Sequence, residues 1–564
     1  MRPIKRFFIL SLMMIIYFNQ VNAQSEKWQI IDHAFKNKKE LYFSFTFQSK
    51  NQLNLVSKII SIDKIEGQKA YAYASRDDFD QFLDSSIEYQ ILEHPNSLFT
   101  ATMFDAQLKK TYAWDSYLTY EDYVDIMYQF AADYPTICQV FSIGESVEGR
   151  EILMAKISDN IANKEDEPQF LYSGQIHGDE LVTSILMLRL IDYLTSNYGS
   201  DTQVNNLVNE IEIWINPLAN PDGLYAGGNQ TVNGATRFNA NGVDINRNFP
   251  DPEDGDHPDG KSWQTETLAF IKLADEQHFT MSANTHAGVE VVNYPWDTWS
   301  RLAADDNWWQ LVAHEYADLA QANSPSGYME GWDDGITNGY DWYSVAGGRQ
   351  DYMNYFHQCR EVTLEQSIAK FLSIDKLPAF WDYNKQAMLN YLEQVTYGFR
   401  GKITDAETGD PIQAKIEIEG HDFDNSYVTS NAQGNYYRPI KSGTYTLQFS
   451  ADAYDSKTIS NQIIGDFDSK TIDVQLQKTS TAIDESISSS ILIVNPIVNH
   501  RLKITSPVVI KEIKIYSILG QLLYAEKTNA SQMEINLEHW KGAVYLVDLE
   551  ISSGKHIQKK ILAN

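Results

Sequence analysis

Apolar and polar residues follow two different periods along this chain. Tyr120–Tyr134 and Leu181–Leu194 carry apolar side chains three and four residues apart, which predicts helices packed on a core. Short apolar or β-branched runs predict strands at 137–142, 152–158, 211–216 and 279–285, and a last amphipathic helix is predicted at 380–395. Strands that alternate with helices favour a mixed sheet with helices on its faces. We therefore expect an α/β sandwich over residues 111–397.

The pattern changes after residue 397. Ala414–Glu419 and Gly443–Phe449 alternate with period two between turn sequences, which predicts a small all-β sandwich at 398–478. A Ser/Thr/Asp-rich linker at 479–490 leads to a second small all-β domain at 491–564. Residues 24–110 hold strand-like segments and one short helix, and we interpret them as either a prosegment or an accessory domain.

Length and charge narrow the class of protein. A chain of 564 residues exceeds one hydrophobic core, so several domains are expected. The net charge of −31 argues against nucleic-acid binding, which needs basic patches. Residues 491–564 differ from the rest, with nine Lys/Arg against six Asp/Glu. The last domain is therefore compositionally distinct.

The first residues predict export. Residues 1–23 combine a basic start, an apolar run at Phe7–Phe18 and a small-residue cleavage site at Val21-Asn22-Ala23, which is typical of a signal peptide. No later apolar run is long enough to span a membrane, so we expect no transmembrane segment in the mature chain. The two cysteines, Cys138 and Cys359, either pair in an oxidising compartment or remain buried thiols.

A candidate metal site follows one of the predicted strands. His177 and Glu180 stand three residues apart between an apolar run and a helical pattern, at a point where α/β sheets present chemistry. An imidazole and a carboxylate are two plausible zinc ligands, and a catalytic zinc needs a third. His286, at the end of the predicted strand 279–285, is one candidate. His257, in an acidic loop without a strand to fix its geometry, is a lower-ranked rival.

Three further segments carry polar chemistry. Residues 237–250 are dense in Asn, Arg, Gly and Asp, which indicates either an exposed loop or an anion clamp, because Arg donates bidentately to a carboxylate. The glycine-rich segment around Tyr343 is a candidate mobile lid. In the strand-like run 361–365, alternation puts Glu361 and Glu365 on one face.

These motifs together resemble the M14 zinc carboxypeptidases, in particular the carboxypeptidase N/E/D-like branch, over residues 120–478. The resemblance rests on HGDE at 177–180, PDG at 221–223, Arg237 separated by eight residues from NRNFP at 246–250, HAGVEVVNYPWD at 286–297, WYSVAGGRQD at 342–351 and EVTLEQS at 361–367. It implies a mixed-sheet α/β catalytic domain followed by a transthyretin-like β-sandwich. Residues 491–564 are similar to the C-terminal sorting domain of the type IX secretion pathway of Bacteroidota.

The resemblance also implies a set of functional residues. One Zn²⁺ per catalytic domain would be held by His177, Glu180 and His286, with water in the open position. The other implied roles are Glu365 as general base, Arg237 as oxyanion donor, Asn246 and Arg247 as the grip on the substrate's terminal carboxylate, and Tyr343 as the group that closes over it.

Two positions bear on the residue that is removed. In the family a residue after the lid glycines lines the specificity pocket, and here it is Gln350. In the N/E/D-like branch an Asp eleven residues after the third ligand favours basic side chains, and here it is Asp297. Arg349 departs from the branch, which often has an apolar residue there, and its charge would oppose a basic side chain. We expect removal of C-terminal Lys or Arg.

The expected partners are peptide or protein C-termini and, through the last domain, the secretion machinery; the expected location is outside the cell or on its surface. Two alternatives stay open. The same zinc site could serve a peptidase or amidohydrolase acting on peptidoglycan-type or γ-linked substrates. The chain could instead be an inactive peptide-binding surface protein, against which the intact His177, Glu180, His286 and Glu365 argue.

Overall fold

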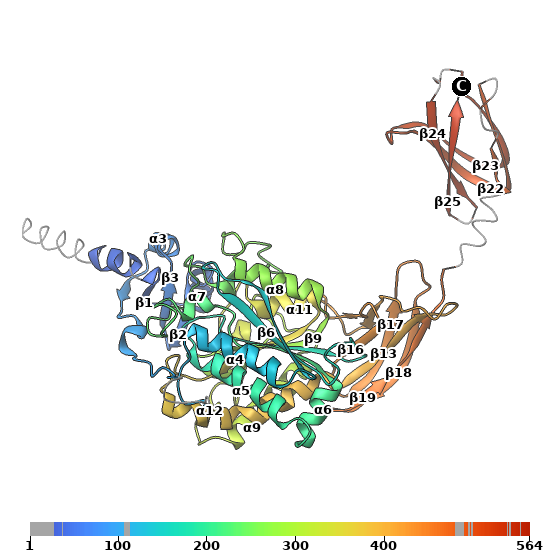
Figure 1. Cartoon of the computed structure of the whole chain (residues 1–564). Helices are drawn as coiled ribbons and strands as arrows, with labels where there is room; N and C mark the ends of the chain where they lie inside the picture. The colour runs from blue at the N-terminus through green and yellow to red at the C-terminus, as the bar shows by residue number, and fades with distance from the viewer. Residues whose placement is uncertain are drawn as a thin grey trace, which may run out of the picture. The chain divides into compact units, whose positions relative to one another are not determined.

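A computed structural model describes residues 28–36, 38–105, 113–479, 490–493, 497, 500–538, 540, 543–552 and 554–563. The expected signal peptide and nearly all of the expected linker lie outside the described residues. The chain divides into two compact units, one of residues up to 452 with 456–476, the other of 453–455 with the residues from 477 on. Figure 1 shows the elements. Within the described ranges, no helix has both the length and the apolarity to cross a bilayer.

The first unit is built on one mixed sheet of eight strands. Its order is β11-β10-β12-β9-β7-β8-β6-β5. The strands are β5 Cys138–Glu145, β6 Glu151–Ile157, β7 Gln169–Gly174, β8 Glu212–Asn216, β9 Phe279–His286, β10 Glu290–Tyr294, β11 Ile336–Asn338 and β12 Arg360–Gln366. The four central strands, β12, β9, β7 and β8, are parallel neighbours. They are buried along their whole length, as expected for strands covered on both faces.

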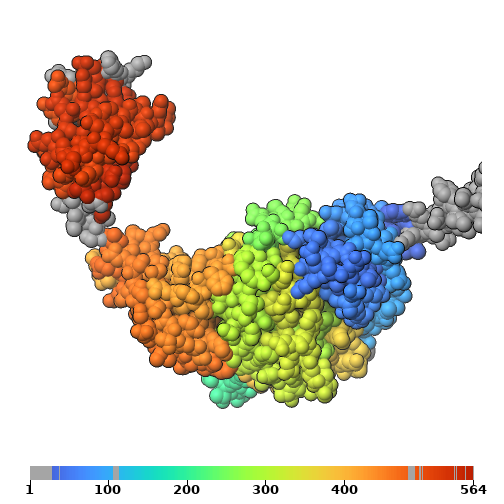
Figure 2. Space-filling model, turned by 180° about the vertical axis from the view of Figure 1, so that it is seen from behind, coloured from blue at the N-terminus to red at the C-terminus, as the bar shows by residue number. Residues whose placement is uncertain are grey.

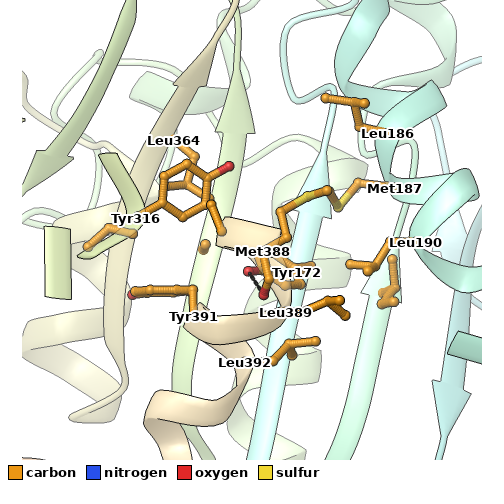
Figure 3. Packing of buried hydrophobic residues seen from close by; sticks show 14 of the residues in the cluster. Tyr172, Leu186, Met187, Leu190, Tyr316, Leu364, Met388, Leu389, Tyr391 and Leu392 are labelled. Carbon is orange, nitrogen blue, oxygen red and sulfur yellow. Dashed lines mark hydrogen bonds between the residues drawn. The ribbon is translucent and has the colours of Figure 1, made fainter. Parts of the chain in front are cut away.

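Helices cover both faces of this sheet. One face carries α4 Tyr120–Asp133, α5 Leu181–Asn197, α6 Thr202–Glu210, α9 Asp306–Ala322 and α12 Leu377–Glu393, which share one large apolar cluster with the sheet. The other face carries α8 Thr265–Glu276 and α11 Arg349–His357 around a smaller cluster. Figure 3 shows the larger cluster, where the Tyr172 hydroxyl donates to the Met388 carbonyl oxygen at 3.0 Å. The predicted α/β sandwich is confirmed.

Residues 28–105 form a smaller α/β body within the first unit. Its four-stranded antiparallel sheet has the order β2-β3-β1-β4. The elements are β1 Leu41–Thr46, α2 Lys50–Val56, β2 Ser61–Glu66, β3 Lys69–Ala74, α3 Arg76–Asp84 and β4 Tyr89–Ile91. Its apolar core continues into the central domain, because Tyr343 belongs to the same cluster. Figure 2 shows this body, in blue, seated against the central domain.

All-β domains complete the chain, as predicted. Residues 398–476 fold as two facing four-stranded sheets, with β16-β13-β19 and β20 in one and β15-β14-β17-β18 in the other. Their strands are β13 Gly398–Asp405, β14 Lys415–Ile418, β15 Val428–Thr429, β16 Asn435–Arg438, β17 Gly443–Ser450, β18 Lys457–Ile464, β19 Ser469–Thr471 and β20 Val474–Leu476. The second unit is a five-stranded sheet of β21 Leu492–Ile493, β22 Arg501–Ser517, β23 Leu522–Asn536, β24 Ala543–Ile551 and β25 His556–Ala563.

The two cysteines do not pair. Cys138 begins β5 and Cys359 precedes β12, and both are buried free thiols. Burial raises the pKa of the Cys138 thiol to about 12 and that of Cys359 further. Neither thiol is therefore a nucleophile at neutral pH.

Candidate active site

The three predicted metal ligands come from the carboxyl ends of two neighbouring strands. His177 follows β7, Glu180 precedes α5, and His286 is the last residue of β9. Because β7 and β9 are parallel neighbours, their carboxyl ends meet at one edge of the sheet. There the Nδ1 atoms of the two histidines lie 3.1 Å apart, and each lies 3.0 Å from a carboxylate oxygen of Glu180. The three side chains form one buried cluster.

The turn that leads into this cluster depends on a glycine. A Cβ on Gly178 would lie 2.2 Å from the backbone carbonyl carbon of Gly223, so the two loops could not cross there with any other residue. Glu180 is the N-cap of α5, yet its side chain makes no capping hydrogen bond. The carboxylate faces the two imidazoles instead. The Glu180 side chain therefore contributes to the histidine cluster rather than to capping of the helix.

The second ring nitrogen of each histidine fixes its tautomer. Nε2 of His177 lies 3.1 Å from an oxygen of Asp244, and Nε2 of His286 lies 2.5 Å from the side-chain oxygen of Asn284. Burial opposes ionisation of Asp244, but Arg237 and His177 hold its pKa well below the usual range, so it only accepts. Each Nε2 thus carries the hydrogen, and each Nδ1 presents a lone pair to the cluster.

This arrangement fits a metal ion. Two imidazole lone pairs and a carboxylate converge with no donor among them, so a cation is the group that satisfies all three. Ligand atoms about 2.0–2.1 Å from a tetrahedral zinc lie about 3.3 Å from one another, close to the separations found here. Burial lowers the pKa of His286 to about 4, so this ring stays neutral, the form that binds metal.

Glu365 and Arg237 flank the cluster in the same cavity. Glu365 pairs in register with His286 across β12 and β9, and both line the cavity. Burial and then the charge of Glu180 raise the pKa of Glu365 well above its usual range. The Arg237 Nε–H donates to Asp244 at 3.0 Å, and one terminal nitrogen of Arg237 lies 3.7 Å from Glu180. A buried carboxyl group with a raised pKa and a guanidinium therefore stand beside the three predicted ligands.

The predicted carboxylate grip lies in the same cavity. Asn246, Arg247 and Tyr343 all line it. The Arg247 guanidinium donates to the Asn246 backbone carbonyl at 2.7 Å and to the Tyr343 hydroxyl at 3.5 Å. Within the described residues it has no ion pair, and its buried Nε–H has no acceptor. An unpaired guanidinium beside the cluster is suited to an anionic ligand.

Asp297 forms an acidic end of the cavity. The Asn293 amide donates to the Asp297 carboxylate at 2.9 Å, while the buried side-chain oxygen of Asn293 has no donor among the residues that the structure describes. Gly339 lies so close that a Cβ there would be 1.7 Å from Asp297. Burial raises the pKa of Asp297 to about 6. The cavity thus ends in acceptors that lack a cationic donor.

Two expected pocket residues are not on the cavity wall. Gln350 is fully buried beside it, and its side-chain amide has no hydrogen-bond partner in the described ranges. Arg349 turns away from the cavity and pairs with Glu361 at 3.0 Å, so its charge does not oppose a basic side chain in the cavity. His257, the rival ligand, packs on Trp263 and is not part of the cluster.

Residues 28–105 supply one wall that the sequence did not reveal. Ile62 and Asp63 line the cavity with the metal ligands. Asp63 pairs with Lys370 at 2.6 Å, and the Lys370 ammonium also lies 3.4 Å from Glu180. The cavity is small, about 50 Å³, enough for about three or four water molecules. The body at 28–105 therefore forms part of the lining around the cluster.

Three parts of the chain match known protein families. Residues 123–387 match a family model described as "Zinc carboxypeptidase". Residues 398–477 match "Carboxypeptidase regulatory-like domain", and residues 495–564 match "Secretion system C-terminal sorting domain". The three matches agree in kind and order with the three resemblances expected from the motifs.

Individual relatives give the same result. The human carboxypeptidase N catalytic chain is 35% identical over 382 residues, which cover 60% of this chain and 81% of that protein. Carboxypeptidase D of Anas platyrhynchos is 37% identical over 379 residues, and this chain spans only about a quarter (26%) of its length. Among solved structures, carboxypeptidase A from Helicoverpa armigera aligns with a TM-score of 0.48 at 18% identity, covering 63% of this chain and 98% of that chain.

Proposed function

Because the chain belongs to the zinc carboxypeptidase family, we propose that it is a secreted metallocarboxypeptidase that removes a C-terminal Lys or Arg from peptides or proteins. One observation carries the proposal. A single cavity holds a converging His-Glu-His cluster, a buried Glu beside it and an unpaired guanidinium. Metal chemistry and recognition of a chain end are thereby joined in one site.

The metal centre would be formed by His177, Glu180 and His286. A zinc ion there supplies Lewis acidity, which lowers the pKa of a bound water and polarises the scissile carbonyl. Asp244 contributes by keeping His177 in the tautomer that a metal needs. Asp244 also accepts hydrogen bonds from the Arg237 guanidinium and from the Asn246 backbone N–H. Asp244 therefore helps to orient a proposed metal ligand, His177, the proposed oxyanion donor, Arg237, and Asn246 of the carboxylate grip.

Glu365 would move the proton. It takes a proton from the attacking water and delivers it to the leaving amine, which lets one group serve as base and then as acid. Arg237 would bind the negative charge that develops on the carbonyl oxygen, from a position fixed by Asp244 before the reaction begins. Both roles are supported by the positions of these side chains beside the cluster.

The carboxylate grip explains why an exopeptidase reaction is favoured. Arg247 and Asn246 offer donors to the terminal carboxylate of a substrate, and Tyr343 lies next to them. An internal peptide segment has no carboxylate to offer. It would leave the donors of Arg247 without a partner, at a cost of about 1–3 kcal/mol for each buried group.

The basic preference is supported by the acidic end of the cavity. Asp297 and the unsatisfied oxygen of Asn293 are acceptors that an ammonium or guanidinium group would satisfy. Asp351 and Asp251 lie close behind, and Asp351 accepts the backbone N–H of Asp297 at 3.0 Å. The ionised Asp297 carboxylate therefore favours a substrate cation over a neutral or acidic side chain.

Export would follow from the C-terminal domain. The chain carries a secretion system C-terminal sorting domain at 495–564, which implies export by the type IX route. This domain has a positive net charge while the whole chain is strongly negative, which agrees with a function separate from catalysis. The enzyme would then act at the cell surface or in the medium, on the C-termini of peptides or proteins.

A release assay on purified full-length protein tests the proposal. Peptides that differ only in their last residue, ending in Arg, Lys, Ala, Glu or meso-diaminopimelate, are incubated with and without a chelator, and zinc content is measured on the same preparation. The proposal requires about one zinc per chain and chelator-sensitive release of Arg or Lys. Release of diaminopimelate alone would favour a peptidoglycan peptidase, and zinc-loaded protein with no release would favour a binding protein.

A further inference from the structure

We infer that Arg349 is a positioning residue that connects the metal ligand His286 to Asn246 of the carboxylate grip. The inference rests on the proposed function. It adds a buried series of hydrogen bonds that leads from His286 through Asn284 and Glu361 to Arg349. The Arg349 side chain is fully buried, which requires a specific partner for its charge.

The route begins in the register of two parallel strands. Across β9 and β12, His286 pairs with Glu365, Asn284 with Thr363, and Ser282 with Glu361. Because alternate residues of a strand share a face, these polar pairs line up beneath the cavity. All of them are buried. Such a ladder of polar residues in the interior of a sheet is expensive unless each group has a partner.

The groups below the His286–Glu365 pair are hydrogen-bonded to one another, whereas the buried Oε2 of Glu365 has no partner among the described residues. His286 Nε2 donates to the Asn284 oxygen at 2.5 Å, and the Asn284 amide nitrogen donates to Glu361 at 2.9 Å. The Ser282 hydroxyl donates to the other Glu361 oxygen at 2.7 Å. Arg349 closes the ladder with two bonds to the same carboxylate, at 3.0 and 3.2 Å.

The charge of Glu361 sets the orientation of the Asn284 amide. An ionised carboxylate only accepts, so it turns the amide nitrogen of Asn284 toward itself and the oxygen toward His286. That orientation obliges Nε2 of His286 to carry the hydrogen and leaves its Nδ1 free for the metal. Without Arg349, the Glu361 carboxylate loses the two hydrogen bonds that fix its position, and the orientation of the Asn284 amide loses its support.

The backbone of Arg349 makes the contact with Asn246 of the carboxylate grip. Its N–H, at the start of α11, donates to the Asn246 side-chain oxygen at 2.9 Å. The same residue thus holds the metal ligand through its side chain and the carboxylate grip through its backbone. A shift of Arg349 changes the separation between the two sites that a substrate has to bridge.

The test compares three variants of the full-length protein with the wild type. Arg349→Met removes the cation and keeps the volume. Arg349→Met/Glu361→Met removes both charges, a change that often restores stability after loss of one buried partner. Arg360→Met is the matched control, because Arg360 is a buried arginine on β12, next to Glu361, whose ion pair is with Asp305, at 3.0 Å, rather than with the ladder.

Three measurements are made on each protein: zinc affinity by competition with a chelator, the visible spectrum of the Co²⁺-loaded protein, and thermal unfolding without metal. We expect zinc to bind about 10-fold more weakly to both variants that lack Arg349, with an altered Co²⁺ spectrum. The double variant regains unfolding stability over the single variant but not zinc affinity. Arg360→Met is destabilised while its zinc affinity and Co²⁺ spectrum match the wild type.

Two results would overturn the inference. If the double variant binds zinc as tightly as the wild type with an unchanged Co²⁺ spectrum, the ladder has a structural role alone. If Arg360→Met weakens zinc binding as much as Arg349→Met, the effect is general destabilisation. A wild type that binds no zinc would instead refute the proposed function, so the two failures are distinct. Should Arg349→Met not fold, the double variant still decides the question.

Discussion

Replacing Asp297 by Asn tests the acidic end of the cavity most directly. Asn has almost the same shape and can still accept from the Asn293 amide, so the change removes charge and little else. Asp297 is buried, and no other carboxylate among the described residues lines that part of the cavity. A substrate cation would lose its charge-assisted hydrogen bond, worth about 1.5–3 kcal/mol.

That loss converts into a specificity change. We expect kcat/KM on peptides ending in Arg or Lys to fall by roughly 10–150-fold in Asp297→Asn, since about 1.4 kcal/mol corresponds to a factor of ten. Peptides ending in Ala should change little, because their side chain makes no ion pair there. The assay measures initial rates on peptides identical except for the last residue, and the Arg-to-Ala ratio cancels any general effect on the metal site.

The pH dependence gives a second reading of the same carboxylate. Burial raises the pKa of Asp297 to about 6, so the group is ionised at pH 7 and mostly protonated at pH 5. Since a substrate cation is attracted to the ionised form, the wild-type Arg-to-Ala ratio should rise with pH and be roughly tenfold larger at pH 7 than at pH 5. In the Asn variant the ratio should be flat. A variant that keeps both the preference and its pH profile would refute the role of Asp297.

Three further outcomes follow from the site. Glu365→Gln should keep zinc and lose roughly 10²–10⁴-fold in kcat, because proton transfer is lost; zinc content and rate on one preparation check this, and an unchanged rate would contradict it. Arg247→Ala should raise KM for peptides with a free C-terminus, because their carboxylate loses its guanidinium partner; initial rates over a range of peptide concentrations check this, and a KM equal to that of the wild type would contradict the grip. Chelation should lower the melting temperature and added zinc should restore it, because the ion binds the folded state; calorimetry would show no shift if the cluster held no metal.

The periods of the sequence predicted helices α4, α5 and α12 and strands β5, β6, β8, β9 and β12, but not helices α6, α8, α9 and α11. The run Leu181–Leu194 became the first fourteen residues of α5, and the strand expected at 279–285 became β9 with His286 added. Helix α9 was not predicted, although its buried side chains recur at helical spacing from Trp309 through Val312 and Tyr316 to Ala320. The order of the strands in the eight-stranded sheet was not predicted either. β9 inserts between β7 and β12, which depends on packing between distant segments rather than on local pattern.

The site shows the same division between local and distant information. The motif residues were accessible to sequence reasoning because each stands at a strand end or in a dense polar loop. Asn284 had a usable signal, since it lies two residues before His286 and therefore on the same face of β9. Asp244 lay within the polar segment 237–250 without a feature to distinguish it. The ion pair of Lys370 with Asp63 joins segments far apart in the chain, so no local sequence pattern predicts it.

Residues 28–105 belong to the framework of the site as well as to its wall. If residues 28–105 only covered the cavity, their contacts would be limited to the residues around its opening. Here Glu40, which is fully buried, accepts the backbone N–H groups of Arg237 and Phe238 at 3.1 and 3.0 Å, and the Ser61 hydroxyl donates to Asp244 at 2.6 Å. Removing this body would leave two backbone donors beside the site without their acceptor and would take one of the donors from Asp244. The orientation of Arg237 therefore depends on contacts from outside the segment that matches the zinc carboxypeptidase family.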